Sequence, residues 1–403
     1  IMSSDWSSDV CSSDLAAAEE SIATLLEMAR HRRRGRCRLL VAAGCLSQRY
    51  GDELAAGLPE VDLVVGTQAP DWLERALAGE APRVDVGPAG HFLPAPGTPR
   101  VTEPGAASAY LKIADGCSRR CAFCAIPAIR GAMRSRPIAH LVEEARELVA
   151  RGVVELILVA QDTAAYGRDR DDGADLVSLV RALDRVPGLR WQRLLYLYPD
   201  SVPDALLDAL GEVRTLVSYL DVPIQHASGP VLRRMRRGHG PREIERLLAR
   251  IRRRAPGAFV RTTVLVGHPG ETADDFAALV DLVERARFHH LGAFRYSDEK
   301  GTAAYGAGPA VSRRDSYNRM RRVLAVQRRI SRARNRELVG RELEVLVEGA
   351  ADDAGYVLCG RHAGQAPEID GQTFLVDGSA RVGEIATARV TRAGDYDLVA
   401  ELV

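Results

Sequence analysis

The sequence has 403 residues, of which 46% are hydrophobic and 27% are charged, and its formal net charge is +1. This composition is typical of a globular protein and excludes an intrinsically disordered chain. The length predicts two to four domains of about 100–200 residues each. A net charge near zero provides no overall attraction to nucleic acid or to a membrane surface. No apolar run reaches the ~20 residues of a membrane-spanning helix.

Seven cysteines do not make a disulfide framework in a chain of this length. The N-terminal stretch lacks the basic and apolar regions of a secretory signal. We therefore expect a cytoplasmic protein in which clustered thiols are metal ligands or catalytic groups.

Residues 1–15 form a stretch rich in Ser and Asp that is unlike the rest of the chain. Its core, "SDWSSDVCSSDL", resembles the in-frame translation of a sequencing adapter. We interpret residues 1–15 as an artefact joined to a truncated gene. A natural disordered leader is the alternative.

Residues 16–86 are predicted to form a truncated, Rossmann-like α/β domain, because strand and helix patterns alternate as in a parallel sheet. The predicted elements are a helix at 19–34, a strand and helix start at 36–50, a strand at 61–68 and a helix at 69–79. Residues 87–107 are rich in Pro and Gly and are predicted to be a linker.

Residues 108–338 contain a second α/β series with six strand–helix units, which predicts a partial or full (βα) barrel. The predicted strands lie at 109–116, 155–163, 191–199, 219–225, 259–270 and 290–297. Active sites of such barrels lie at the C-terminal ends of the strands. Several polar residues stand at these ends and are candidates for cofactor or substrate contacts.

A long helix is predicted at 312–338, and residues 311–337 contain ten arginines but only two acids, Asp315 and Glu337. This pattern indicates either a solvated helix face or a contact with ribosomal RNA or another polyanion. From residue 339 onward, short strands separated by turns predict a small all-β barrel that ends at 403.

The predicted C-terminal barrel is acidic. Residues 341–403 contain twelve Asp or Glu and five Arg, a net charge of −7. Acids repel phosphate backbones, so this surface is better suited to a strongly basic protein partner.

The stretch "GCSRRCAFCAIP" places Cys117, Cys121 and Cys124 directly after the first strand of the second series. Iron–sulfur clusters are normally held by four thiolates. Three thiolates therefore leave one iron open to a substrate or cofactor. Structural zinc, which normally takes four closed ligands, and a disulfide with one free thiol are the alternatives. Phe123 is expected to shield the cluster from water.

This cysteine spacing resembles the radical S-adenosylmethionine (SAM) superfamily. "LVAQDTAAYGRD", "VLVGHPGET", "GCLSQRY" and the C-terminal barrel, which resembles a TRAM domain, are similar to methylthiotransferases. Within that group, "AQDTAAYG", "YLDVPIQHAS" and "QAPEIDG" resemble the RimO branch. The resemblance implies a transferase that methylthiolates the β-carbon of an aspartate in ribosomal protein S12, giving 3-methylthioaspartate.

The resemblance also implies the cofactors and their ligands. A [4Fe–4S] cluster held by Cys117, Cys121 and Cys124 binds SAM on its open iron and provides the radical chemistry. The cofactor-binding residues that it implies are Phe123, Gln161, Gln225, Gly267 and Glu271.

The family holds a second [4Fe–4S] cluster in its first domain with three cysteines. Cys45 in "GCLSQRY" matches one of these ligands. Cys11 falls in register with another, but its neighbours do not match the family. We therefore expect the second cluster to be incomplete in this chain.

The resemblance implies ribosomal protein S12 as partner, bound through the acidic TRAM barrel, and contact with the ribosome. It identifies no electron donor. Two other functions stay open: methylthiolation of an adenosine in tRNA, as in the MiaB branch, and a truncated module that binds cluster and substrate without transferring sulfur.

Overall fold

The computed structural model describes residues 15–67, 72–90, 92–100, 105–351, 355–376, 378 and 380–403. The predicted artefact, apart from the backbone of Leu15, and Cys11 lie outside the described residues. The chain forms two compact units: residues 1–94, 115–134 and 297–307 make the first, and residues 95–114, 135–296 and 308–403 the second. In the described ranges, no helix combines the length and apolarity needed to cross a bilayer.

The first unit contains a three-stranded parallel sheet in the order β1-β2-β3. Its strands are β1 (Val41–Ala43), β2 (Leu63–Val65) and β3 (Val84–Asp85). Its helices are α1 (Leu15–Arg34), α2 (Cys45–Gly57), α3 (Trp72–Ala78) and α4 (Ile126–Arg130). The predicted alternation of strands and helices is confirmed. The two-residue β3 was not predicted, because so short a strand has no periodicity to detect.

The second unit contains two three-stranded parallel sheets that together follow chain order, β4-β7-β8 and β9-β10-β11. These strands are β4 (Ser108–Lys112), β7 (Glu155–Val159), β8 (Trp191–Leu194), β9 (Tyr219–Asp221), β10 (Phe259–Val266) and β11 (His290–Arg295). A single parallel bridge joins Gln192 to Leu216 near the point where β8 and β9 meet. The six predicted strands are therefore present as a partial barrel.

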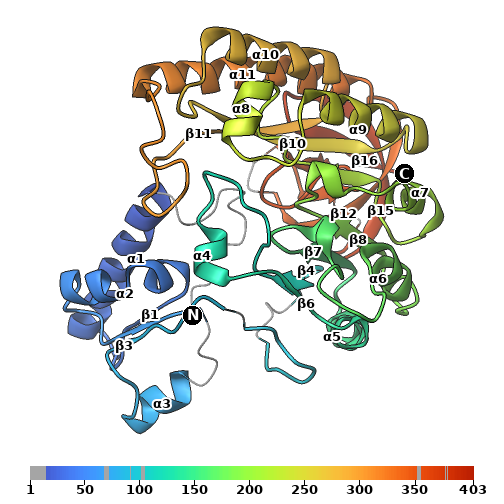
Figure 1. Ribbon diagram of the computed structural model, residues 1–403. Helices are drawn as coiled ribbons and strands as arrows, with labels where there is room; N and C mark the ends of the chain where they lie inside the picture. Colours follow the sequence, from blue (N-terminus) through green and yellow to red (C-terminus); the bar gives the residue numbers. More distant parts are fainter. Residues whose placement is uncertain are drawn as a thin grey trace. The chain divides into compact units, whose positions relative to one another are not determined.

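The helices between these strands are α5 (Ile138–Ala150), α6 (Leu176–Leu183), α7 (Asp204–Glu212), α8 (Gly229–Arg234), α9 (Pro241–Arg254), α10 (Ala273–Ala286) and α11 (Arg313–Arg336). Figure 1 shows α10 and α11 side by side. The short elements are β5 (Ala114–Asp115), β6 (Arg134–Ser135) and the 3-10 turns η1 (Thr163–Ala165) and η2 (Pro199–Ser201). The long arginine-rich helix was predicted to within two residues at its ends.

Strand β8 is shorter than the predicted strand at 191–199. Tyr196 adopts a positive φ of 61°, which is costly for a bulky residue. Its backbone N–H donates to Asp221 Oδ2 at 2.9 Å, and Leu197 N–H donates to the Asp221 carbonyl at 2.9 Å. These two bonds turn the chain out of the strand beyond Leu194, and a periodicity argument does not detect such a turn.

Residues 342–402 form a closed five-stranded barrel in the order β12-β13-β14-β16-β15. Its strands are β12 (Glu342–Ala350), β13 (Leu358–His362), β14 (Thr373–Leu375), β15 (Ile385–Ala393) and β16 (Leu398–Leu402). Alternate residues point inward, and Val345, Val347, Leu375, Ala388 and Ala400 make the core. The predicted all-β barrel is confirmed.

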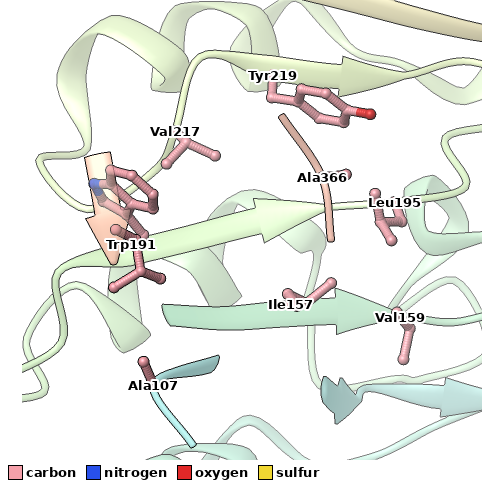
Figure 2. Close-up of a cluster of buried hydrophobic side chains, with 9 residues drawn as sticks. Ala107, Ile157, Val159, Trp191, Leu195, Val217, Tyr219 and Ala366 are labelled. Atoms are coloured by element: carbon pink, nitrogen blue, oxygen red, sulfur yellow. The ribbon is translucent and has the colours of Figure 1, made fainter. Parts of the chain in front are cut away.

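This barrel shares an apolar cluster with the parallel strands of the second unit (Figure 2). Leu346 and Ala366 of the barrel belong to the same cluster as Trp191, Val217 and Tyr219. Each of these side chains is at most 6% exposed. The C-terminal barrel is thus part of a common hydrophobic core.

A buried ion network reinforces that junction. Glu155 on β7 is fully buried and receives Arg193 Nε at 2.8 Å and Arg361 Nη2 of the barrel at 2.6 Å. Arg361 also contacts Glu348 Oε1 at 2.7 Å. Burial raises the pKa of the Glu155 carboxyl, but the two guanidinium groups outweigh it and lower this pKa to about 2.

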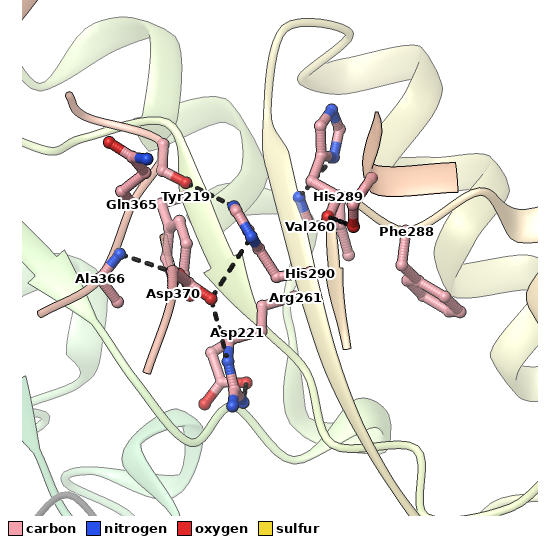
Figure 3. A network of polar contacts seen from close by, with 12 residues as sticks. Tyr219, Asp221, Val260, Arg261, Phe288, His289, His290, Gln365, Ala366 and Asp370 are labelled. Atoms are coloured by element: carbon pink, nitrogen blue, oxygen red, sulfur yellow. Dashed lines mark hydrogen bonds and ion pairs between the residues drawn. The ribbon is translucent and has the colours of Figure 1, made fainter. Parts of the chain in front are cut away.

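Asp370, within "QAPEIDG", is the centre of a second network (Figure 3). Its carboxylate accepts from Tyr219 OH at 2.7 Å and from the Ala366 N–H at 2.9 Å, and it lies 3.4 Å from both Arg261 Nε and His290 Nδ1. This stretch, which resembled the RimO branch, therefore holds the C-terminal barrel against the parallel strands.

Candidate functional site

The three clustered cysteines lie on a loop of the first unit that begins at Gly116, which has a positive φ of 76°. Cys117 N–H donates to the Gly131 carbonyl at 3.0 Å, and Cys124 N–H donates to the Cys121 carbonyl at 3.2 Å. The first bond ties the start of the loop to Gly131, and the second closes a short turn from Cys121 to Cys124, so the three cysteines lie on one loop.

A second segment of the first unit, residues 297–307, contacts this loop. The backbone N–H of Ala304 donates to the Ala122 carbonyl at 2.8 Å. The same segment is tied to α2, because Glu299 Oε2 lies 2.8 Å from Arg49 Nη1 and both side chains are about one-tenth exposed. The cysteine loop is therefore supported by residues far from it in the sequence.

The donor chemistry of the loop fits an iron–sulfur cluster with three protein ligands. None of the three cysteines is part of a disulfide with a described residue, and Cys117 is buried. Arg119 N–H points to Cys117 Sγ at 3.4 Å, a contact that stabilises a thiolate. In the described ranges, no three His, Cys, Asp or Glu side chains are already arranged as a metal cage. The fit thus rests on the donor set and the loop. Phe123 is half-buried beside Cys124.

Cys45 stands at the first position of α2 in the first unit, after Gly44 with a φ of 124°. Its Sγ accepts a hydrogen bond from Arg130 Nη2 at 3.2 Å. Arg130 Nη1 lies 3.1 Å from Oδ1 of the buried Asp115, just before the cysteine loop. Burial alone would lower the pKa of Arg130, but Cys45 and Asp115 outweigh it and raise this pKa. Arg130 thus joins Cys45 to the base of the cysteine loop.

The first unit offers only limited support for a second cluster. Besides the loop and Cys45, its described residues contain one more cysteine, Cys37, whose Sγ contacts the Leu39 carbonyl at 3.5 Å. Cys11 lies outside the described residues. Two cysteines are fewer than the three that the family uses, so the described residues do not fit a second cluster.

Two predicted cofactor contacts stand at the C-terminal ends of strands in the second unit. Gln161 follows β7, and its Oε1 is buried without a hydrogen-bond partner among the described residues. A buried acceptor without a partner is costly unless a ligand or water satisfies it. Gln225 follows β9 with a positive φ of 67° and pairs with β10 through Thr263 and Leu265. Such strain in a non-glycine residue is typical of functional sites.

Gly267 and Glu271 form a tight turn after β10. Gly267 has a φ of 81°, and a Cβ there would lie 2.7 Å from Ser316 Cβ. Glu271 Oε2 accepts from Gly267 N–H at 2.5 Å, and its Oε1 from Arg319 Nη1 of α11 at 2.8 Å. Burial raises the pKa of Glu271, and Arg319 opposes this shift. Oε2 therefore closes the turn on itself, and Oε1 joins the turn to α11.

Three histidines lie near this turn or near the C-terminal barrel. His226 Nε2 lies 3.9 Å from Glu271 Oε2, and burial lowers the pKa of His226 to about 3. His268, for which no role was predicted, is buried, and its ring lies tilted against the Tyr296 ring at a centroid distance of 5.2 Å. A cavity of about 360 Å³ lies elsewhere, between α9, α11 and the C-terminal barrel, with His362 in its wall.

Comparison with known proteins decides the family. A model of the radical SAM superfamily matches residues 111–283, and a TRAM domain model matches residues 339–403. The chain is 49% identical over 393 residues to the ribosomal protein uS12 methylthiotransferase RimO of Sorangium cellulosum (strain So ce56), covering 96% of this chain and 80% of that protein. The chain belongs to the RimO family.

Other members of the RimO family agree with this assignment. The protein of the same name from Myxococcus xanthus (strain DK1622) is 46% identical, covering 96% of this chain and 81% of its own length. The fold also resembles the radical SAM methyltransferase TsrM from Kitasatospora setae, with a TM-score of 0.56 at 18% identity over 73% of this chain and 64% of that one. The predicted RimO branch and the radical SAM and TRAM folds are confirmed.

Sequence reasoning missed two residues that organise these sites, Arg130 and Arg319. Arg130 lies 85 positions from Cys45, and Arg319 lies 48 positions from Glu271. Arg319 is one of ten arginines in its stretch, so composition gives it no distinguishing signal. The one sequence signal for Arg130 is Asp115, which directly precedes the cysteine loop, because a carboxylate buried there requires a cationic partner.

Proposed function

We propose that this chain is a radical SAM methylthiotransferase that modifies an aspartate of ribosomal protein uS12 in the cytoplasm. The observation that carries the proposal is the loop that carries three cysteine thiols within eight positions, found in a chain 49% identical to a RimO protein. The predicted division into domains at 16–86, 108–338 and 339–403, with a linker at 87–107, is part of the proposal.

Cys117, Cys121 and Cys124 are proposed to hold a [4Fe–4S] cluster, and SAM is proposed to bind its open iron. Such a cluster with SAM supplies the homolytic chemistry that removes a hydrogen atom from the aspartate β-carbon. The half-buried Phe123 beside the loop limits access of water.

The second unit is proposed to bind and orient SAM. Gln161 presents a buried, unsatisfied acceptor, which suits an ammonium or hydroxyl donor of the cofactor. Gln225 is held rigidly by its bonds to β10. Gly267 and Glu271 shape the neighbouring turn, and Glu271 acts through Arg319 and the backbone rather than as a free carboxylate.

Cys45 is proposed as one thiol of the sulfur-donating site of the family. Since the described residues offer no second ligand beside it, no step is assigned to a second cluster. Arg130 would orient the Cys45 sulfur through the 3.2 Å hydrogen bond.

The substrate is proposed to meet the acidic face of the TRAM barrel. Part of the net charge of −7 is used inside the chain, because Asp370 pairs with Arg261 and Glu348 with Arg361. Exposed acids such as Glu384 and Glu401 remain at the barrel surface. They provide complementary charge for a basic ribosomal protein.

The test is anaerobic reconstitution of the chain with iron and sulfide, followed by iron counting and SAM cleavage with dithionite. About four irons per chain and production of 5′-deoxyadenosine are expected. Cys117→Ala should lose both. The matched control is Cys359→Ala, which removes a thiol of the TRAM barrel and should keep both.

Methylthiolation is then measured on a uS12-derived peptide by mass spectrometry. Cleavage of SAM without a methylthiolated peptide would favour the truncated module. Modification of tRNA in place of the peptide would favour the MiaB-like alternative. Bound zinc without iron would remove the radical SAM assignment of the loop.

A further inference from the structure

Helix α11 carries a surface that the proposed function does not use. Ser312 caps its N-terminus, accepting a hydrogen bond from the Asp315 N–H at 3.0 Å. One side of the helix packs against β11 and α10 (Figure 1), with Val323, Val326 and Gln327 fully buried. The opposite side faces outward along the whole length of the helix.

Five exposed arginines on this outward side have no ion pair with any described residue: Arg313, Arg314, Arg321, Arg322 and Arg336. At 3.6 residues per turn they fall within about half of the helix circumference, and at ~1.5 Å per residue they extend over roughly 35 Å. We call these five residues the arginine face.

The acids of the same helix region do not neutralise the arginine face. Asp315 is engaged in the helix cap, with its Oδ2 2.7 Å from Ser312 Oγ. Glu337 pairs with Arg287 at 3.2 Å and with Arg334 at 3.3 Å. The positive charge of the arginine face is therefore uncompensated by its own helix.

Helix α9 shows how an arginine-rich solvated helix is arranged elsewhere in this chain. Arg246 pairs with Glu243 of the same helix, whereas Arg250 and Arg254 pair with Asp204 and Asp208 of the neighbouring α7. Like charges on neighbouring turns destabilise a helix, so interleaved acids are the usual arrangement. Arg242 and Arg253 of α9 are also exposed without an ion pair to any described residue, so what distinguishes the arginine face is its row of five such arginines along one side of a single helix, and this row favours an anionic partner over a merely solvated surface.

Tyr317 adds a second feature of the same side. It is 46% exposed, and the Arg321 guanidinium lies 5.8 Å from the centre of its ring. An exposed aromatic ring among arginines offers a stacking surface for a nucleobase, whereas lipid headgroups and acidic peptides need only the charge.

We propose that the arginine face of α11 binds the phosphate backbone of RNA next to the protein substrate. The choice of RNA rests on the proposed function, because a ribosomal protein is surrounded by ribosomal RNA. Arginine provides bidentate donors for phosphate oxygens, and a row of five spans several consecutive phosphates. The acidic TRAM barrel would meet the basic protein while α11 meets the RNA.

The test measures binding of a labelled single-stranded RNA to the reconstituted chain by fluorescence anisotropy over a range of salt concentrations. The variant replaces Arg314, Arg321, Arg322 and Arg336 by Gln. Its matched control replaces four exposed arginines on other helices and loops, Arg146, Arg185, Arg242 and Arg253, by Gln. Each variant loses four positive charges, so the two variants differ only in where on the surface the charges are removed.

The α11 variant should bind RNA about tenfold more weakly or worse, and the slope of log K against log salt should fall by roughly 0.7 for each phosphate that the variant no longer neutralises. The control should keep most of the affinity. Tyr317→Ala should weaken binding about fivefold with an unchanged slope.

Equal RNA binding by both variants would overturn the proposal. So would an α11 variant that loses binding to anionic vesicles or polyaspartate but keeps its binding to RNA. Methylthiolation of the free uS12 peptide is measured in parallel and should be the same in both variants. Failure of the wild-type chain on the peptide would concern the proposed function alone, since the RNA measurement does not depend on it.

Discussion

Glu155 carries its charge in a fully buried position, and its two arginine partners come from different parts of the second unit. Removing one partner of a buried ion pair leaves an uncompensated charge, which typically costs about 3–5 kcal/mol. We expect Arg361→Met to lower the free energy of unfolding by about that amount, measured by urea denaturation.

The control for this prediction is Arg389→Met. Arg389 pairs with Glu342 on the barrel surface, where both side chains are about half exposed. Exposed pairs contribute less than about 1 kcal/mol. A similar loss of stability in both variants would contradict the role assigned to the buried network.

Buried histidines should make the stability of the chain sensitive to mild acid. Burial lowers the pKa of His289 and of His362 from 6.5 to about 3. The folded state therefore resists protonation, and stability is full above pH 6.5 and falls as the pH drops from 6.5 toward 3. The slope should be about 1.4 kcal/mol per pH unit for each histidine.

The measurement is urea unfolding at pH 7 and pH 5. Glu155 does not interfere with this measurement. Because its pKa is lowered from 4.5 to about 2, its contribution to the folding stability is lost only between these two pH values, below the interval measured. His362→Asn keeps an acceptor for the Gly364 N–H, which donates to His362 Nδ1 at 3.0 Å. The variant should reduce the pH slope, and an unchanged slope would show that His362 does not contribute.

At the scale of elements, the turn between β10 and α10 is fixed by a close approach to α11. Gly267 requires a φ of 81°, and an added Cβ would meet Ser316 Cβ at 2.7 Å. Gly267→Ala should therefore destabilise the chain by about 1–3 kcal/mol and weaken SAM binding, measured by thermal unfolding and equilibrium dialysis.

A second substitution separates the two causes. Ser316→Gly in the Gly267→Ala background removes the steric contact but leaves the backbone strain. Partial recovery of the melting temperature is expected. Full recovery would mean that the left-handed conformation carries no cost, and no recovery would mean that the contact with α11 is unimportant.

The elements themselves were largely predictable, because apolar periodicity and turn residues are local signals. The cysteine loop was predictable for the same reason, since Cys117, Cys121 and Cys124 lie within eight positions. Pairings such as Arg361 with Glu155, 206 positions apart, depend on the folded arrangement. The acidity of the TRAM barrel was counted correctly, but sequence could not reveal that Asp370 and Glu348 are paired inside the chain.

For the whole second unit, the shared cluster in Figure 2 predicts cooperative unfolding. Leu346 of the TRAM barrel is fully buried in this cluster. Leu346→Ala should cost about 2–5 kcal/mol and should destabilise the radical SAM strands together with the barrel.

Hydrogen exchange of amides in β7 and β12 is the appropriate measurement. Faster exchange in both strands is expected for Leu346→Ala. Faster exchange in β12 alone would show that the TRAM barrel unfolds independently. Val345→Ala, which removes a side chain from the interior of the barrel instead, is the comparison that should affect β12 first.

The Glu155–Arg193–Arg361 network also limits how this architecture can be recombined. A TRAM barrel taken from a relative that modifies a different substrate would arrive without Arg361 unless its sequence happens to supply an equivalent cation. Glu155 on β7 of the recipient would then lack the second of its two cationic partners and keep only Arg193. A chimera with new substrate specificity should therefore take the residues at positions 155, 193 and 361 from the same parent protein.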